Sequence, residues 1–295
     1  MTAPALEIRK LVVIGVGLIG GSFALALKQA RIAHHVVGVG RTRKNLEAAL
    51  ELGVIDESSE DAALAVREAD LVLLAMPVGQ MPEVMAQIAP ALGAGTVITD
   101  GGSTKQDVIG YAKRFLWAHF DRFVPAHPIA GTEKSGATAA FAELYRDRNV
   151  ILCAQPQTSA SALALVRRAW EACGARVLEL DASRHDEIFA AVSHLPHVVA
   201  FGLVSMLARR PDAAELLAFS GGGLRDTVRI AGSSPEMWRD ICMANRDALT
   251  KLLDDYLKEL ELARAALASG DGHALEKMFD TAREARRRWL LKEPG

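Results

Sequence analysis

His127 is the residue of this sequence best placed for proton chemistry. It follows a short strand-like run, residues 122–126, and precedes a loop that contains Pro128, Gly131 and Gly136. Catalytic side chains are commonly presented from such loops, and a neutral imidazole can accept a proton near physiological pH. The alternative is a loop histidine that makes only a structural hydrogen bond.

Ser103 is a second candidate, in a segment that follows a predicted strand at residues 96–99. Ser103 and Gln106 have the S-x-x-Q spacing of a capping box, so the serine could start the next helix. A hydroxyl at the carboxyl end of a strand can also face a bound ligand. The two roles are compatible.

The C-terminal half carries two further polar pairs. His194 and His197 lie three residues apart on one side of a predicted helix, which Pro196 should kink. Helical zinc sites use HExxH spacing and a third ligand, so we expect polar recognition and no metal. Arg225 and Arg229 follow a glycine run, and their guanidinium groups suit carboxylate recognition. Solvated ion pairs are the alternative for these arginines.

A glycine pattern near the N-terminus indicates a cofactor. The apolar run 11–14 passes into Gly15, Gly17 and Gly20, and a helix-forming stretch follows. Strand, glycine turn and helix in this order are typical of a dinucleotide site, where the pyrophosphate lies at the helix N-terminus. An ordinary strand-to-helix turn of a parallel sheet is the alternative. The intervening residues predicted to contact the dinucleotide are Leu18 and Ile19.

The residue after the second strand of such a site commonly selects the nucleotide. A carboxylate there binds the ribose 2′-hydroxyl of NAD, and an arginine accommodates the 2′-phosphate of NADP. Here Arg41 and Arg43 follow the predicted strand 36–39, and no carboxylate stands at that place. We therefore expect NADP, with NAD as the alternative. Two solvated arginines at a helix start would explain the same residues.

The elements that position these groups follow an alternating pattern. Strand-length apolar runs alternate with helical stretches, which predicts an α/β fold with a Rossmann-type, mostly parallel sheet and helices on both faces. Ligands bind at the carboxyl ends of such strands. Met76, Pro77 and Val78 follow the predicted strand 70–75 and are expected to line the cofactor.

Strand patterns stop near residue 182. We predict a dinucleotide-binding domain over residues 1–182 and an all-helical C-terminal domain for substrate binding and dimerisation over 183–295. Residues 235–267 carry an apolar stripe longer than one small domain easily covers. The stripe is either a homodimer interface or buried within the helical domain.

Composition narrows the class of protein. The chain has 295 residues, 50% of them hydrophobic and 24% charged, and a formal net charge of −2, so nothing favours nucleic acid as a partner. No uninterrupted apolar run reaches membrane-spanning length, and we expect neither export nor insertion. Three widely spaced cysteines argue against a disulfide framework and favour a cytoplasmic location. The partner we expect is a small-molecule substrate.

Taken together, the motifs resemble the prephenate and arogenate dehydrogenase family. The resemblance rests on residues 15–21, 100–105, 127–136, 193–197, 225–231 and 237–240. It implies a nucleotide-binding domain followed by a helical dimerisation domain. It also implies a monofunctional enzyme of tyrosine biosynthesis that oxidises and decarboxylates prephenate or arogenate with NAD(P)+.

The resemblance also implies roles for single residues. His127 matches the catalytic histidine, and Ser103 matches a serine that keeps this histidine, the substrate hydroxyl and the nicotinamide in register. His197 and Arg229 match substrate-binding positions, with Arg229 as the carboxylate clamp. Further implied members of the substrate cleft are Thr132, Glu133, His194 and Trp238.

Glu133 bears on which substrate is preferred. If it faces the substrate side chain, its carboxylate would favour the ammonium of arogenate over the carboxylate of prephenate. Two rival functions share the overall plan: a β-hydroxyacid or imine reductase-type enzyme, and a non-catalytic dinucleotide-sensing dimer. The reductase would usually carry a catalytic lysine in its helical domain, and it gives no reason for the His127 segment.

Overall fold

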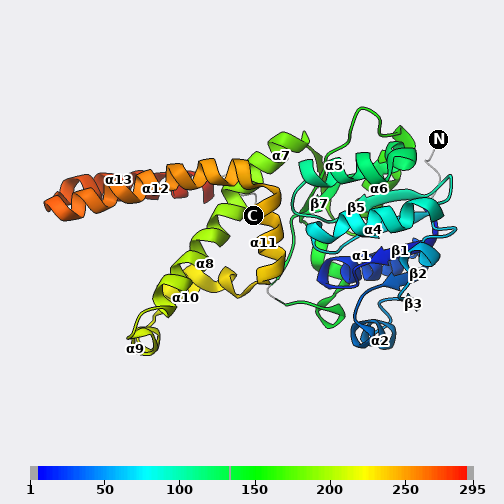
Figure 1. Cartoon of the computed structure of the whole chain (residues 1–295), viewed down its shortest axis with the longest axis horizontal. Helices are drawn as coiled ribbons and strands as arrows, with labels where there is room; N and C mark the ends of the chain where they lie inside the picture. The colour runs from blue at the N-terminus through cyan, green and yellow to red at the C-terminus, as the bar shows by residue number, and fades with distance from the viewer. Residues whose placement is uncertain (1–5, 133, 291–295) are drawn as a thin grey trace. The chain divides into compact units, whose positions relative to one another are not determined.

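The computed structural model describes residues 6–132 and 134–290, and a six-stranded sheet organises its N-terminal part (Figure 1). The strand order is β3-β2-β1-β4-β5-β6, and every neighbouring pair is parallel. The strands are β1 (Ile8–Ile14), β2 (Ala33–Val39), β3 (Glu57–Ser59), β4 (Leu71–Leu74), β5 (Val97–Asp100) and β6 (Phe123–Val124). The predicted parallel sheet is confirmed.

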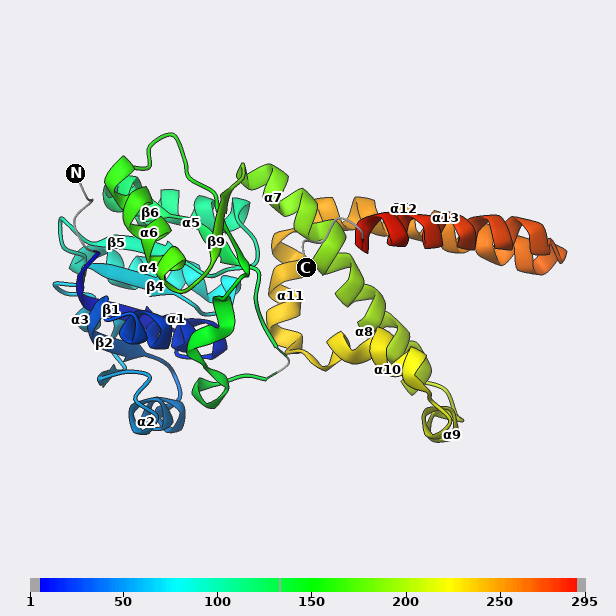
Figure 2. The ribbon, with the colours of Figure 1, turned by 180° about the vertical axis from the view of Figure 1, so that it is seen from behind.

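Helices cover both faces of this sheet (Figures 1 and 2). They are α1 (Leu18–Gln29), α2 (Arg43–Glu51), α3 (Ala62–Ala65), α4 (Met81–Ile88), α5 (Gln106–Phe115) and α6 (Ala160–Ala172). Leu11 and Val13 belong to the core shared with α1 and α6, whereas Val12 and Ile14 belong to the core shared with α4 and α5. Both faces of β1 are therefore buried, which is why its sequence is a continuous apolar run.

The strand expected at residues 122–126 divides between two sheets. Pro125 separates β6 from β7 (Ala126–Pro128), and its carbonyl accepts a hydrogen bond from the backbone nitrogen of Cys153. A proline has no N–H to donate, so a regular ladder cannot continue through it. The new sheet has the order β7-β8-β9, with β8 (Asn149–Leu152) antiparallel to β7 and β9 (Arg176–Glu179) parallel to β8. His127 thus lies in β7.

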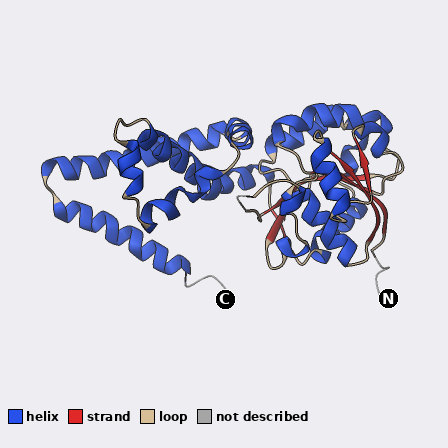
Figure 3. Ribbon diagram, turned by 90° about the horizontal axis from the view of Figure 1, so that it is seen from below, coloured by secondary structure: helices blue, strands red, loops and turns tan. Residues whose placement is uncertain are grey.

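Short 3₁₀ turns connect these elements. They are η1 (Val78–Gln80), η2 (Ala89–Ala91), η3 (Trp117–Arg122), η4 (Ala137–Ala139) and η5 (Ala142–Tyr145). After β9 every described element is helical (Figure 3).

A long helical segment opens the C-terminal part. It comprises α7 (Ala182–Phe189), a π-helical turn (Ala190–His194) and α8 (Leu195–Ala208). The wider turn ends two residues before Pro196, which lacks the N–H that an α-helix would use at that point. The helix is therefore interrupted where the proline predicted a kink.

Further helices follow. They are α9 (Ala213–Ala218), α10 (Gly222–Val228), the 3₁₀ turn η7 (Arg229–Gly232), α11 (Pro235–Ala244), α12 (Arg246–Ser269) and α13 (Gly272–Leu290). The chain forms two compact units, Met1–Arg246 and Asp247–Gly295. Within the apolar stripe, Ile241 and Leu249 are buried, whereas Leu260 and Leu267 are exposed.

One described segment is long and apolar enough to cross a membrane by length and composition. It is Ala182–Ala208, which contains an 18-residue window of mean hydropathy 1.7, and 22% of that window is buried. No apolar run of that length was expected from the sequence, because polar residues such as His194 and His197 interrupt it. A helix buried in a protein core passes the same test.

Candidate active site

The glycine turn after β1 has the shape that a dinucleotide site requires. Gly15 has φ of +100°, and a Cβ there would lie 2.5 Å from the carbonyl oxygen of Ala75. A Cβ at Gly20 would lie 2.3 Å from the carbonyl oxygen of Gly15. These two positions therefore need glycine, one for the turn and one for close packing of α1 on β1.

Gly17 differs from its two neighbours because nothing lies within 4 Å of the Cβ position. It is the N-cap of α1, no side chain caps the helix there, and the first turn has no acidic residue. The first backbone N–H groups of the helix are therefore available to an anion. The turn fits the pyrophosphate of a nicotinamide dinucleotide.

The predicted cofactor-lining residues come together at the carboxyl ends of the strands. A Cβ on Gly101, after β5, would lie 3.1 Å from Cγ2 of Ile19, and one on Gly102 would lie 2.9 Å from Cγ1 of Val78. The loops after β1, β4 and β5 thus meet at one edge of the sheet. Leu18 and Val78 are buried, whereas Ile19, Met76 and Pro77 are half-buried.

Arg41 and Arg43 lie at the start of α2, and both are exposed. Asn45 holds this helix start to the glycine turn, because its Nδ2 donates to the carbonyl of Val16 at 2.7 Å. The Nε of Arg43 donates to Glu47 at 3.0 Å. Arg43 is thus paired within its own helix.

His127 is buried, with 8% of its surface exposed, and its imidazole belongs to a chain of polar groups. Its Nδ1 lies 2.8 Å from Nε2 of His185, and Nδ1 of His185 lies 2.8 Å from Oδ1 of Asp186. The ring of Phe189 packs against it, with centroids 4.7 Å apart. Burial, with smaller effects of His185 and Lys105, holds the pKa of His127 well below its usual value. His127 is therefore a neutral imidazole at physiological pH.

Asp186 performs the capping that was one of the two interpretations of Ser103. Its carboxylate accepts hydrogen bonds from the backbone nitrogens of Lys105, at 2.8 Å, and Gln106, at 2.9 Å, where α5 begins. The N-cap residue of α5 is Lys105, and it makes no side-chain cap bond. The capping interpretation of Ser103 is therefore wrong, because a carboxylate from a distant helix reaches the helix start.

A buried ion pair joins the loop of Ser103 to the strand of His127. Lys105 Nζ donates to Asp100 and, at 2.8 Å, to the carbonyl of Ala126. Asp100 accepts in turn from the backbone nitrogen of Ala126 at 3.0 Å. Both ionic side chains are completely buried, and each charge is matched by its partner and by backbone groups. The pair fixes β7 against the end of β5.

The predicted histidines of the helical part lie beside this network. His194 is fully buried, and its Nδ1 lies 3.2 Å from Nδ2 of Asn245, which also donates to the carbonyl of Asp186 at 2.8 Å. Burial lowers the pKa of His194 to about 4. His197 stacks on Trp238 with ring centroids 3.5 Å apart. His194, His197 and Trp238 are thus brought together.

Arg229 lies in η7, near enough to His197 for its charge to act on it. Burial, and then the charge of Arg229, lower the pKa of His197, against a hydrogen bond from the ring to the carbonyl of Ser193. Thr132 is exposed, and its hydroxyl accepts from the backbone nitrogen of Lys134 at 3.2 Å. Glu133 lies outside the described residues.

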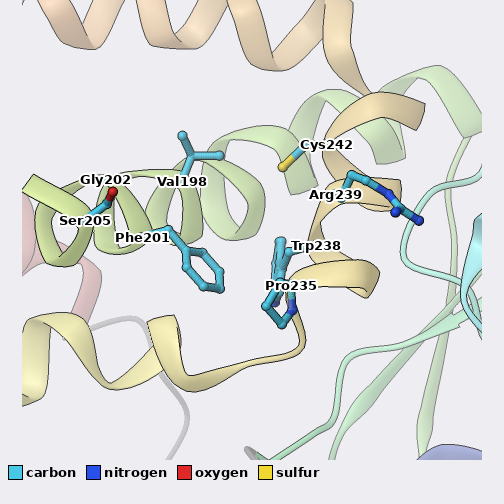
Figure 4. Close-up of a pocket in the computed structure, with 8 residues that line it drawn as sticks. All are labelled: Val198, Phe201, Gly202, Ser205, Pro235, Trp238, Arg239 and Cys242. Carbon is cyan, nitrogen blue, oxygen red and sulfur yellow. The ribbon is translucent and has the colours of Figure 1, made fainter. Parts of the chain in front are cut away.

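An apolar pocket of about 440 Å³ opens between α8 and α11 (Figure 4). Phe201 and Val198 line it from α8, and Trp238 and Cys242 line it from α11. Trp238, a predicted site residue, is part of this lining, and His197 stacks on its ring. In the described residues no group of three or more His, Cys, Asp or Glu is arranged to hold a metal ion.

Sequence reasoning missed His185, Asp186, Lys105 and Asn245. Asp186 meets the start of α5 across 81 positions of sequence, and no local spacing announces such a contact. The one available signal was the adjacent His-Asp pair in a helix that turns strongly apolar a few residues later. Buried polar residues are retained where they have partners.

The chain matches two sequence profiles of known domains. Residues 23–179 match the prephenate dehydrogenase nucleotide-binding domain, and residues 181–281 match the prephenate dehydrogenase dimerization domain. The cyclohexadienyl dehydrogenase of Zymomonas mobilis is 39% identical over 94% of this chain and 95% of its own length. The prephenate dehydrogenase of Bacillus subtilis is 35% identical over 95% of this chain and 76% of its own length.

A solved structure is similar throughout. The prephenate dehydrogenase of Aquifex aeolicus, in complex with hydroxyphenyl propionate and NAD+, superposes with a TM-score of 0.86 at 32% identity, covering 96% of this chain and 99% of the other. Fold, glycine turn and these similarities define an oxidoreductase that binds a nicotinamide dinucleotide. The chain belongs to the prephenate dehydrogenase family, which acts in tyrosine biosynthesis.

Proposed function

We propose that the chain oxidatively decarboxylates prephenate, arogenate or both, giving 4-hydroxyphenylpyruvate or tyrosine. The observation that carries this proposal is the buried His127 in β7, next to the loop after β5 whose Gly101 lies close to both Pro128 and Ile19 of the glycine turn. Such an imidazole can accept the proton of the substrate C4 hydroxyl at its Nε2 atom. A bound nicotinamide would supply the hydride acceptor.

The bond changes balance around the substrate ring. The hydroxyl proton passes to Nε2 of His127 and the C4 hydrogen leaves as hydride. The electron pair of the C1–carboxylate bond then enters the ring as carbon dioxide departs. Ser103, in the loop that Lys105 fastens to β7, would keep the hydroxyl aligned with the imidazole. Gain of aromaticity drives the reaction, so the residues mainly position the groups.

Substrate recognition is assigned to the helical side of the site. Arg229 would clamp a substrate carboxylate, because its guanidinium can bind two oxygens at once. His197, held by its stacking on Trp238, would add a hydrogen bond, and His194 would shape the cleft behind it. Thr132 is assigned to the rim because it is exposed.

Glu133 would tune which substrate is accepted. Next to the substrate side chain, its carboxylate favours the ammonium of arogenate over the pyruvyl carboxylate of prephenate. Glu133→Gln should therefore lower the ratio of kcat/KM for arogenate to kcat/KM for prephenate. An unchanged ratio would eliminate this role.

NADP is the proposed cofactor, with NAD as the alternative. The reason is the exposed Arg41 after β2, in a position where NAD-preferring sites carry a carboxylate. The cofactor-contacting set would then comprise Gly15, Gly17, Leu18, Ile19, Gly20, Arg41, Arg43, Met76, Pro77 and Val78.

The assembly proposed is a homodimer through the helical domain, with the domain boundary at residues 182/183. Supporting it are the dimerization-domain match and exposed apolar side chains such as Met206 and Phe219. A second copy suits the segment Ala182–Ala208 better than a membrane, because His185, Asp186 and His194 lie within it in hydrogen bonds. Three free cysteines fit a cytoplasmic location.

Formation of NADH or NADPH, measured by absorbance with each substrate and each nucleotide, tests the proposal. We expect turnover of prephenate or arogenate. Turnover of neither would favour a β-hydroxyacid or imine reductase, or a dinucleotide-sensing dimer. Binding of a reduced nucleotide with reduction of a keto acid or imine would then separate those two.

A further inference from the structure

We propose that His185 and Asp186 act as positioning residues for His127: they fix which ring nitrogen carries its proton, and they stabilise the charge it gains. The three side chains form one buried hydrogen-bonded relay, Asp186–His185–His127, and each of its two hydrogen bonds is 2.8 Å long. The inference rests on the proposed function in one respect only, that His127 is the base.

The ionised carboxylate of Asp186 determines which atom donates in each hydrogen bond of the relay. Burial raises the pKa of Asp186, but the hydrogen bond from His185 and those from the backbone nitrogens at the start of α5 outweigh it and leave the pKa below its usual value. Asp186 is therefore ionised and only accepts. Nδ1 of His185 must consequently carry the proton that it donates to Oδ1 of Asp186.

The donor in the hydrogen bond between His185 and His127 is then determined as well. Burial holds the pKa of His185 below its usual value, so its ring is neutral and its Nε2 is a bare lone pair. Nδ1 of His127, 2.8 Å away, must donate to it. The proton of neutral His127 is thus on Nδ1, and Nε2 is left with the lone pair that a base needs.

The relay also supplies a negative charge that stabilises the cationic form of His127. The titratable groups that act on His127 are His185 from α7, Lys105 from the start of α5 and His194 from the π-helical turn, and all three disfavour its cationic form. Once His127 takes a proton, the Asp186 carboxylate is the anion linked to it, through a single imidazole. Lys105 is already paired with Asp100. The carboxylate thus stabilises the imidazolium as it forms.

Asp186→Asn is the direct test. An uncharged amide removes the anion that stabilises the imidazolium of His127, and only one of its two terminal atoms can still accept hydrogen bonds from His185 and the backbone at the start of α5. We expect kcat to fall on the order of 100-fold or more, with KM for the dinucleotide unchanged. Glu187→Gln is the matched control, because Glu187 is the next residue of the same helix α7, is exposed and pairs with Arg184 on the surface. Its kcat should stay at the wild-type value.

The dependence of kcat/KM on pH distinguishes a positioning role of Asp186 from a merely structural role. Loss of the carboxylate disfavours the imidazolium, so the acid limb of kcat/KM should move to lower pH in Asp186→Asn. A merely structural defect would lower the rate without moving the limb. Wild-type kcat together with an unmoved acid limb would overturn the proposal.

Nitrogen NMR of the wild-type enzyme with bound dinucleotide tests the relay without turnover and without depending on whether a variant folds. With ¹⁵N-labelled histidine, His127 should show a protonated Nδ1 and a bare Nε2 at neutral pH. A protonated Nε2 would overturn the relay. If the relay is found but His127→Asn retains full activity, the proposed base is wrong and the relay stands.

Discussion

Oδ1 of Asp186 lies 2.8 Å from the backbone nitrogen of Lys105, so helix α7 is fastened to the loop that carries Ser103. The same oxygen lies 2.8 Å from Nδ1 of His185. One carboxylate therefore caps α5 and anchors the chain that ends at His127. The positions of the proposed hydroxyl and the proposed base are coupled through it.

The packing role of Gly20 and the anion-binding role proposed for Gly17 should separate on substitution. Gly20→Ala forces a Cβ to 2.3 Å from the carbonyl of Gly15, so it should lower the free energy of unfolding by about 1–3 kcal/mol. Gly17→Ala meets no protein atom within 4 Å and should leave unfolding unchanged. It should nevertheless weaken dinucleotide binding about tenfold or more, because its methyl group occupies the anion's place. Urea unfolding and nucleotide titration measure the two effects, and equal binding by Gly17→Ala and wild type would refute this reading of the turn.

Arg41→Ala should shift nucleotide preference. Loss of a charge-assisted hydrogen bond to a 2′-phosphate is worth about 1.5–3 kcal/mol, so kcat/KM for NADP should fall about tenfold or more relative to that for NAD. Arg43→Ala is the control, because Arg43 is paired with Glu47 and should change the ratio less. If Arg41→Ala left the NADP to NAD ratio unchanged, the assignment to Arg41 would fail.

Arg229→Lys should weaken substrate binding and leave nucleotide binding unchanged. A lysine keeps the charge but loses the two-pronged hydrogen bond, so kcat/KM for the substrate should fall about 10- to 100-fold. Steady-state kinetics with each substrate measures the change, and nucleotide KM is the internal control. A matching rise in nucleotide KM would indicate a general distortion of the protein.

Burial of His194 should make stability depend on pH. Its pKa is about 4 in the folded protein against 6.5 for an ordinary histidine, so the unfolded chain binds the proton first. Stability present above pH 6.5 is therefore lost as the pH falls, by about 2 kcal/mol at pH 5 from this residue. His194→Gln should flatten the dependence of the free energy of unfolding between pH 7 and pH 5. The exposed His34→Gln should not, and an unchanged slope in His194→Gln would count against the account.

The parallel sheet, the glycine turn and the helical C-terminal part were predictable because each depends on local pattern. Period, glycine spacing and the run lengths of apolar residues carry that information. The separate three-stranded sheet and the cap from Asp186 were not, because both depend on where distant segments meet. Pro125 could have signalled the first, since it removes a ladder donor between Val124 and Ala126.

Site residues divide in the same way. His127 could be singled out as a candidate from its residue type and the loop that follows it, and its role as the base stays a prediction. The groups that hold it, His185 and Asp186, were not predicted, because their contact with His127 depends on how α7 packs against β7. Tertiary contact, and not local spacing, creates the relay.

Turnover by His127→Asn is the measurement that tests the central claim most directly. The asparagine keeps a polar side chain of similar reach but cannot accept the substrate proton as a base. We predict that kcat with prephenate or arogenate falls about 10²- to 10⁴-fold while the dissociation constant of the nucleotide stays at its wild-type value. Wild-type turnover by this variant would contradict the account.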